Sequence, residues 1–180
     1  MSNATKIQIK KLTLSILATA FITGCATPIT DPERLPIKEN EKREFIYEFS
    51  IPNKSQKEIL KNARNFIASS YVNSNEISRV EDMDDGIIMA KAEIGWKIST
   101  NNSLLPYLSC RSRYEINFVA KNEKARLRLF LIEGALPPCT GWHLPEKKAY
   151  RDIVSEFNSI AKSMDEALKG NSAINKLKDF

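Results

Sequence analysis

Residues 45–71 read FIYEFSIPNKSQKEILKNARNFIASSY and join a strand pattern directly to a helix pattern. Apolar and polar residues alternate over residues 45–51, which predicts a half-buried strand. Ser55 and Glu58 have the spacing of a capping box, in which each side chain binds the backbone N–H group of the other residue. Apolar residues then recur every three or four positions, so the sequence predicts a helix over residues 56–71.

Four more strand patterns and a second long helix pattern follow this stretch. The strand patterns alternate apolar and polar residues, which is typical of an antiparallel sheet with one face in water. We therefore expect an α+β fold of the helix-grip kind: an antiparallel sheet of about five strands packed against two helices, in the order β-α-β-β-β-β-α. The remaining expected elements are strands over residues 76–81, 87–98, 107–120 and 125–133 and a helix that starts at Pro145 and is capped by Gly170.

The first 25 residues have the organisation of a secretory signal peptide. Three lysines precede a mostly apolar run over residues 12–23, which is shorter than the roughly 20 residues that a membrane-spanning helix needs. The run ends in ITGC, and this ending resembles the lipobox of bacterial lipoproteins. An ordinary buried cysteine in an N-terminal helix is the alternative.

The lipobox resemblance implies a covalent membrane anchor on Cys25. In that family the thiol receives a diacylglycerol, the signal peptide (here residues 1–24) is removed, and the new amine is acylated. Several acyl chains together anchor a protein stably, because each buried methylene contributes about 0.8 kcal/mol. Ala26 follows the cysteine, which in Gram-negative lipoproteins favours the outer membrane over the inner one. We therefore expect an envelope lipoprotein on the outer membrane that faces the periplasm.

The rest of the chain divides into three parts. Residues 25–44 contain three prolines and many charges with little apolar periodicity, which predicts a flexible tether. Residues 45–170 are expected to form the α+β domain, and residues 171–180 a polar tail. One domain of this size is able to bury a single core.

The net charge gives no reason to expect nucleic acid as a partner. The chain has 27 Lys and Arg against 22 Asp and Glu, a net charge of +5. Three of the lysines lie in the expected signal peptide, so the mature chain would carry 24 basic and 22 acidic residues, a net charge of +2. Since the expected location is the envelope, we expect no nucleic-acid partner.

Two cysteines, Cys110 and Cys139, remain once Cys25 is assigned to the lipid. An even number in an oxidising compartment suggests a disulfide, which on the loop-entropy model would stabilise the fold by roughly 3–4 kcal/mol. Two free thiols are the alternative. We expect no metal and no cofactor, because the chain has one histidine and no CxxC motif. The acidic turn over residues 82–86 lacks the spacing of a calcium loop, so we interpret it as a hairpin turn.

Four arginines from two neighbouring strands are expected on the exposed face of the sheet. Such a face could bind phosphate head groups, acidic glycans or a partner protein. The alternative, which we favour, is a solvated face with Glu115 and Glu133 between the arginines. Outward-facing apolar residues, Met89 and Phe130 among them, would mark a protein interface if they cluster beside the arginines. The arginines are Arg111, Arg113, Arg126 and Arg128.

Three stretches of the folded part resemble the bacterial DUF4468 family, whose domain has a TBP-like fold. They are the stretch 45–71 quoted above, ISRVEDMDDGIIMAKAEI and RYEINFVAKNEKARLRLF. The shared pattern is a strand, a Ser-capped helix, an acidic turn with Gly, and a strand pair joined by a short charged turn. The resemblance covers approximately residues 44–168 and implies the fold alone, since the family has no assigned activity and no catalytic residues. The term TBP-like describes the path of the chain and implies no DNA binding.

Together these features favour a non-catalytic function. We expect a binding or assembly module that contacts the membrane through the lipid on Cys25 and an envelope protein through the outer sheet face. The alternative is a carrier of a small apolar ligand between the sheet and the helices. An enclosed pocket with several polar groups would favour the carrier, and a flat patch the interaction module. We expect no enzyme, because the single histidine, His143, has no nucleophile motif beside it.

Overall fold

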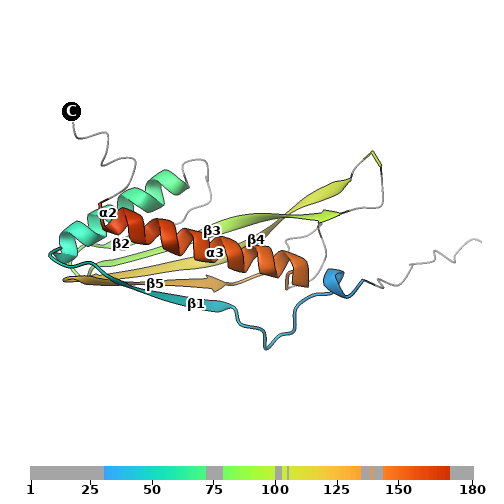
Figure 1. Cartoon of the computed structure of the whole chain (residues 1–180), viewed down its shortest axis with the longest axis horizontal. Coiled ribbons are helices and arrows are strands. Elements are labelled where there is room, and N and C mark those ends of the chain that lie inside the picture. Colours follow the sequence, from blue (N-terminus) through green and yellow to red (C-terminus); the bar gives the residue numbers. More distant parts are fainter. Residues whose placement is uncertain are drawn as a thin grey trace, which may run out of the picture. The chain divides into compact units, whose positions relative to one another are not determined.

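A computed structural model of the chain describes residues 31–71, 79–99, 103–104, 106–134, 139 and 144–170. Its strands and long helices follow the order β-α-β-β-β-β-α, which confirms the predicted α+β fold (Figure 1). A short 3₁₀ turn, η1, precedes the first strand. The elements are η1 (Pro32–Arg34), β1 (Glu44–Ser50), α2 (Gln56–Ser70), β2 (Arg79–Asp82), β3 (Ile87–Ser99), β4 (Tyr107–Lys121), β5 (Lys124–Leu131) and α3 (Lys147–Leu168).

The strands form one sheet in the order β1-β5-β4-β3-β2, and every neighbouring pair is antiparallel. The tight turn between β4 and β5 fixes the register of these two strands. Asn117 pairs with Arg128, and Val119 pairs with Arg126. Because side chains alternate between the two faces of a strand, this register also decides which residues face the helices.

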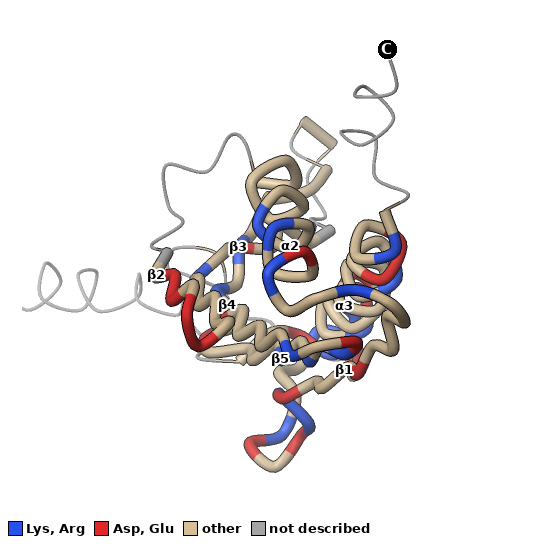
Figure 2. The backbone as a smooth tube through the Cα atoms, turned by 90° about the vertical axis from the view of Figure 1, so that its left-hand side faces the viewer, with Lys and Arg blue, Asp and Glu red and all other residues tan. Residues whose placement is uncertain are grey.

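Both long helices lie on one face of the sheet (Figure 2). Phe157 of α3 is central to the core: its ring centroid is 5.5 Å from that of Phe45 and 4.9 Å from that of Tyr114. The side chains of β3 that face the helices, at alternate positions from residue 88 to residue 98, are all buried. They are Ile88, Ala90, Ala92, Ile94, Trp96 and Ile98.

The start of α2 is fixed by the predicted capping box. The Ser55 N–H donates to Glu58 Oε2 at 3.0 Å, and the Glu58 N–H donates to Ser55 Oγ at 3.3 Å. The adjacent Gln56 N–H donates to Asn122 Oδ1 at 2.9 Å, which joins the helix start to the β4–β5 turn. Gly86 closes the same corner with φ of 72°, and an added Cβ would lie 2.7 Å from a backbone oxygen of β4. Glycine is therefore required at that position.

α3 begins at Lys147, two residues after the predicted start at Pro145. The segment before β1 causes this difference. The Ile37 N–H donates to the Pro145 carbonyl, and the Lys147 N–H donates to the Leu35 carbonyl, both at 3.0 Å. This pairing keeps the backbone extended just before the helix, so it overrides the local preference of proline for the first helical position.

Part of the segment predicted as a flexible tether is bound to the domain. Residues 31–43 fall within that prediction, which covered residues 25–44. Ile37 is only 5% exposed, and Glu33 forms an ion pair with Arg151 of α3. One apolar side chain in a polar, proline-rich context produces no periodicity, which explains why the sequence pattern missed this docking.

β5 is shorter at one end and longer at the other than the predicted strand over residues 125–133. It begins at Lys124, because the turn needs only two residues, Asn122 and Glu123. It ends at Leu131, since the next two N–H groups both donate to the carbonyl of Arg113, at 3.0 and 3.4 Å, and the regular ladder stops there.

Some predicted features lie outside the described residues. They are the signal peptide over residues 1–24, the lipidation site Cys25, the polar tail over residues 171–180, and His143. At the other end of α3 the prediction is confirmed, because Gly170 follows the helix with φ of 97°.

Candidate functional site

The outer face of the sheet carries the four predicted arginines, and each lies beside a carboxylate. The positive charge is therefore compensated within the face, which matches the solvated face with interleaved carboxylates. Exposed ion pairs of this kind contribute about 0–1 kcal/mol each to stability. The pairs are Arg111 and Arg113 with Glu93 (3.3 Å each), Arg113 with Glu133 (3.6 Å), Arg126 with Glu48 (2.6 Å), and Arg128 with Glu44 and, at 3.7 Å, with Glu115.

The outward-facing apolar residues are divided between two places. Phe130 is covered, because the guanidinium carbons of Arg43 and Arg128 lie 5.9 and 4.9 Å from its ring centroid. Met89 is 46% exposed and pairs directly with Val80 of β2, which is 57% exposed. The exposed apolar residues of this face therefore lie at both edges of the sheet, because Ile46 of β1, which pairs with Arg128, is also 52% exposed.

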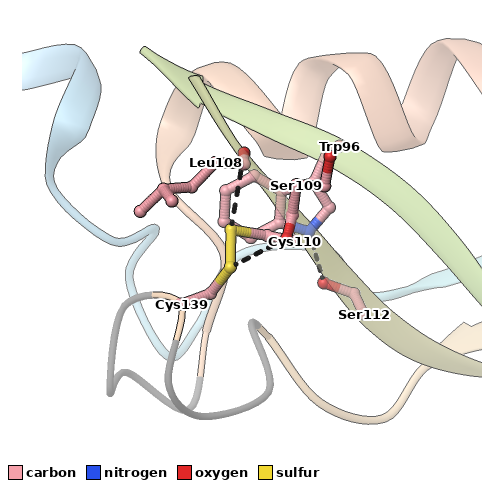
Figure 3. Close-up of a disulfide and its surroundings, with 6 residues drawn as sticks. All are labelled: Trp96, Leu108, Ser109, Cys110, Ser112 and Cys139. Atoms are coloured by element: carbon pink, nitrogen blue, oxygen red, sulfur yellow. Dashed lines mark hydrogen bonds between the residues drawn. A yellow bond between two sulfur atoms is a disulfide. The ribbon is translucent and has the colours of Figure 1, made fainter. Parts of the chain in front are cut away.

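Cys110 and Cys139 form the predicted disulfide, and their Cα atoms are 5.7 Å apart (Figure 3). Cys110 is buried on the arm of β4 that extends beyond its pairing with β5. Next to it, the Trp96 Nε1–H donates to the buried Ser112 Oγ at 3.0 Å. Since Cys139 belongs to the connection between β5 and α3, the disulfide joins that connection to the β3–β4 arm.

A cleft of about 510 Å³ lies between α2, α3 and β3. β2 pairs only with residues 87–90 of β3, and the cleft lies farther along, at residues 93–95. The residues that matter most for its chemistry are Phe66, Tyr71, Tyr114, Asp152, Glu156 and Ser159. A second depression, of about 900 Å³, surrounds the β4–β5 turn, and its lining includes the paired Glu48 and Arg126.

Two tyrosine hydroxyls meet in this cleft. The hydroxyls of Tyr71 and Tyr114 are 2.7 Å apart and share a hydrogen bond in which either can be the donor. Burial strongly raises the pKa of Tyr114, and Tyr71 and the charge of Glu156 raise it further. Burial also raises the pKa of Tyr71, against the opposing effect of the hydrogen bond from Tyr114. Both phenols are therefore neutral at physiological pH.

Asp152 and Glu156 give the cleft its charge. They are one helical turn apart on α3, and neither has an ion-pair partner within the described part of the chain. The neighbouring Arg151 is engaged by Glu33 of η1. The described residues that line the cleft include no Lys or Arg. The cleft is therefore acidic, whereas the outer sheet face is balanced.

The positions of the residues that line this cleft were not predicted from the sequence. A signal was present on α3, where polar residues recur at intervals of four, three and four beside the apolar stripe; they are Asp152, Glu156, Ser159 and Ser163. The tyrosine pair gave no signal, because Tyr71 and Tyr114 are 43 residues apart and each fits the apolar pattern of its own element.

The acidic turn between β2 and β3 is a hairpin turn, as predicted. Asp82 Oδ1 accepts hydrogen bonds from the N–H groups of Asp84 and Asp85, at 3.1 and 3.0 Å. In the described part of the chain, no three His, Cys, Asp or Glu side chains gather in a way that could hold a metal ion. Neither α2 nor α3 has the length and apolar character needed to cross a bilayer.

Residues 45–133 match the family described as "Domain of unknown function (DUF4468) with TBP-like fold". The folded part resembles the DUF4468 family, as predicted. The matching range contains all five strands and α2 and ends before α3. The DUF4468 match therefore covers the β3 wall and the α2 wall of the cleft, while the wall with Asp152 and Glu156 lies beyond it.

Two solved structures are similar to this chain. A TBP-like protein from Parabacteroides distasonis ATCC 8503 has a TM-score of 0.50 and 11% identity, over 76% of this chain and 98% of that chain. A DUF4468 family protein from Bacteroides ovatus ATCC 8483 has a TM-score of 0.48 and 14% identity, over 78% of this chain and 89% of that chain. Identities this low concern the fold alone. No curated protein matches the chain.

Proposed function

We propose that this protein is a lipid-anchored, non-catalytic binding module of the bacterial envelope, with its ligand site in the cleft between α2, α3 and β3. The observation that carries the proposal is the cleft itself, which combines aromatic and aliphatic walls with several polar groups. Its volume lies within the roughly 300–1,000 Å³ of small-molecule sites, and its lining is more polar than is usual for them. A carrier with its site between sheet and helices is thus the binding module that the geometry supports best, and its ligand has polar groups as well as an apolar part.

The groups in the cleft suit binding better than catalysis. The described lining contains no histidine, cysteine or lysine. Burial keeps Tyr71 and Tyr114 protonated, so neither phenol is a base at neutral pH. Asp152 and Glu156 are exposed carboxylates, which can recognise a positively charged group of a ligand.

The lipid anchor rests on the lipobox pattern that ends at Cys25. The mass of the protein purified from membranes tests it, because a diacylglyceryl and an acyl group on residue 25 add to the mass of the processed chain. Cys25→Ser should lack these groups and, because lipidation precedes removal of the signal peptide, should keep the mass of residues 1–24. A double Cys110→Ala/Cys139→Ala variant is the control and should carry the same lipid mass as the wild type. Wild-type protein without lipid would contradict the anchor.

The ligand site is tested with the full-length protein extracted from the envelope in detergent. Native mass spectrometry should show a small molecule that stays bound to the wild type and is lost from Ser159→Trp, in which the indole fills the cleft. Ser155→Trp is the matched control, since Ser155 is exposed on the same helix and is not part of the lining. A wild type without a bound molecule, or the same molecule on Ser159→Trp, would argue against the carrier.

An envelope protein as a partner is the second candidate. The observation in its favour is the exposed pair Val80 and Met89 beside the charged outer face, a mixture found in protein interfaces. Crosslinking in intact cells should capture a reproducible envelope protein that is lost with Met89→Glu and with combined Arg113→Glu and Arg128→Glu. Capture that survives both variants would exclude this surface.

A further inference from the structure

Two carboxylates in the lining of the cleft, Asp152 and Glu156, form no ion pair with a described residue. We infer that the cleft takes a small organic cation, in which a protonated amine is attached to an apolar group. This inference rests on the proposed function, since it names the ligand class of the same site. Three independent features of the lining carry it: its carboxylates, its aromatic walls and the edge of β3 at Gly95.

The carboxylates are the first feature. Asp152 and Glu156 project from successive turns of α3 into a cleft whose described lining has no Lys or Arg. Glu93, the third carboxylate of the lining, is held by two arginines at 3.3 Å, and on the outer sheet face Glu48 is held by Arg126 at 2.6 Å. Two carboxylates without ion-pair partners in the lining of a cleft favour the binding of a positively charged ligand and disfavour that of an anion.

The aromatic walls are the second feature. Phe66 and Tyr71 contribute ring surface from the end of α2, and Ile94 and Ile160 add aliphatic surface. A cation over an aromatic ring gains about 0.5–1 kcal/mol at an exposed site. The same surfaces contact the apolar part of the ligand, so the cleft suits an amine that carries a ring or a short hydrocarbon chain.

The edge of β3 at Gly95 is the third feature, because no strand of the described part of the chain pairs with β3 there on the side away from β4. The Ala120 N–H donates to the Gly86 carbonyl at 2.8 Å, so even-numbered positions of this ladder bond toward β4. Gly95 therefore directs its N–H and carbonyl to the opposite edge, into the part of the cleft beyond β2. An ammonium has three N–H donors, and the Gly95 carbonyl and the Ser159 hydroxyl offer acceptors beside the two carboxylates.

Three probes of the same size and different charge test this inference on the full chain: phenethylammonium, phenethyl alcohol and hydrocinnamate. Two-dimensional amide NMR should show that the cation shifts the resonances of Ile94, Gly95 and Ser159 in a saturable way and at lower concentration than the other two probes. Its affinity should exceed that of the alcohol by about tenfold, the change expected for one charge-assisted contact. Equal affinity for the three probes, or tighter binding of hydrocinnamate, overturns the inference.

Variants locate the charge that is recognised. Combined Asp152→Asn and Glu156→Gln should weaken phenethylammonium binding about ten- to a hundredfold and leave phenethyl alcohol unchanged. Glu166→Gln is the control, because Glu166 is exposed on the same helix outside the cleft. No loss in the double variant overturns the inference. If neutral or anionic probes bind at the cleft residues as tightly as the cation, this inference fails and the proposed ligand site is still supported. The proposed ligand site itself is tested separately, by the comparison of Ser159→Trp with the wild type.

Discussion

The hydroxyl of Tyr71, at the C-terminal end of α2, lies 2.7 Å from the hydroxyl of Tyr114, in the middle of β4. This contact joins a helix end to the centre of the sheet at the cleft. Burial raises the pKa of both phenols, and the effect is larger for Tyr114. The folded protein therefore retains protons that the unfolded chain, with tyrosine pKa values of about 10, gives up in alkaline solution.

The first prediction concerns stability at high pH. Because the folded state binds more protons than the unfolded state above about pH 10, the free energy of unfolding should fall there by about 1.4 kcal/mol per pH unit for each such tyrosine. Below that pH this contribution is constant. In Tyr114→Phe the free energy of unfolding should fall less steeply with pH, by the contribution of about one proton. Urea unfolding between about pH 9 and 11 measures this slope.

A non-titrating core variant separates this effect from a general loss of packing. Phe157→Leu should lower the free energy of unfolding at every pH without changing the slope, because Phe157 packs on Tyr114 but carries no proton. An unchanged alkaline slope in Tyr114→Phe would show that the buried hydroxyl is not the group that titrates.

The second prediction concerns the start of α2. Ser55→Ala removes the oxygen that accepts the Glu58 N–H, so the free energy of unfolding should fall by about 1 kcal/mol, within the 0.5–2 kcal/mol range of such caps. Ser155→Ala, on the exposed face of α3, should change it by less than about 0.5 kcal/mol. Urea unfolding of the two variants makes the comparison, and equal losses would mean that the cap contributes nothing specific.

The register of β4 and β5 and the capping box were predictable because both depend on residues close together in the sequence. A two-residue turn permits only one register of the two strands, and in that register Asn117 lies opposite Arg128. The start of α3 was not predictable from local preferences, since Pro145 is held extended by Ile37, more than a hundred residues away.

The candidate site depends on contacts of the same long-range kind. Alternation places Tyr114 on the inner face of β4, but it does not reveal which residue of α2 will meet it. The outer arginines were predicted on the correct face, and only the sheet order, with β1 beside β5, shows that Glu44 and Glu48 pair with Arg128 and Arg126. Local sequence patterns show which face of a strand or helix a side chain lies on. Which side chains from distant elements it contacts depends on how the strands and helices pair in the folded protein.

The third prediction concerns the disulfide between Cys110 and Cys139, which are separated by 29 positions. Opening the loop should lower the free energy of unfolding by about 3–4 kcal/mol, because the reduced unfolded chain gains conformational entropy. Urea unfolding with and without reductant measures the change. The double Cys110→Ala/Cys139→Ala variant is the control, and its stability should not respond to reductant. A reductant effect below about 1 kcal/mol on the wild type would contradict the prediction.

The fourth prediction compares two arginines of the outer sheet face. Arg128 is 33% exposed, pairs with Glu44 and Glu115, and lies over the Phe130 ring at 4.9 Å. Arg126 is 61% exposed and pairs with Glu48 alone. Arg128→Ala should therefore lower the free energy of unfolding by about 1–2 kcal/mol, the sum of a ring contact and partly shielded ion pairs. Arg126→Ala should lower it by less than about 0.5 kcal/mol.

A double-mutant cycle isolates the ring contact from the ion pairs of Arg128. Phe130→Leu keeps an apolar side chain at the same place but removes the aromatic ring, so Arg128→Ala should cost about 0.5 kcal/mol less in that background. High salt supplies the second separation, since it screens the exposed pairs and weakens the ring contact less. If Arg128→Ala costs the same in the wild type and in the Phe130→Leu variant, the guanidinium stabilises the sheet through its carboxylate partners alone.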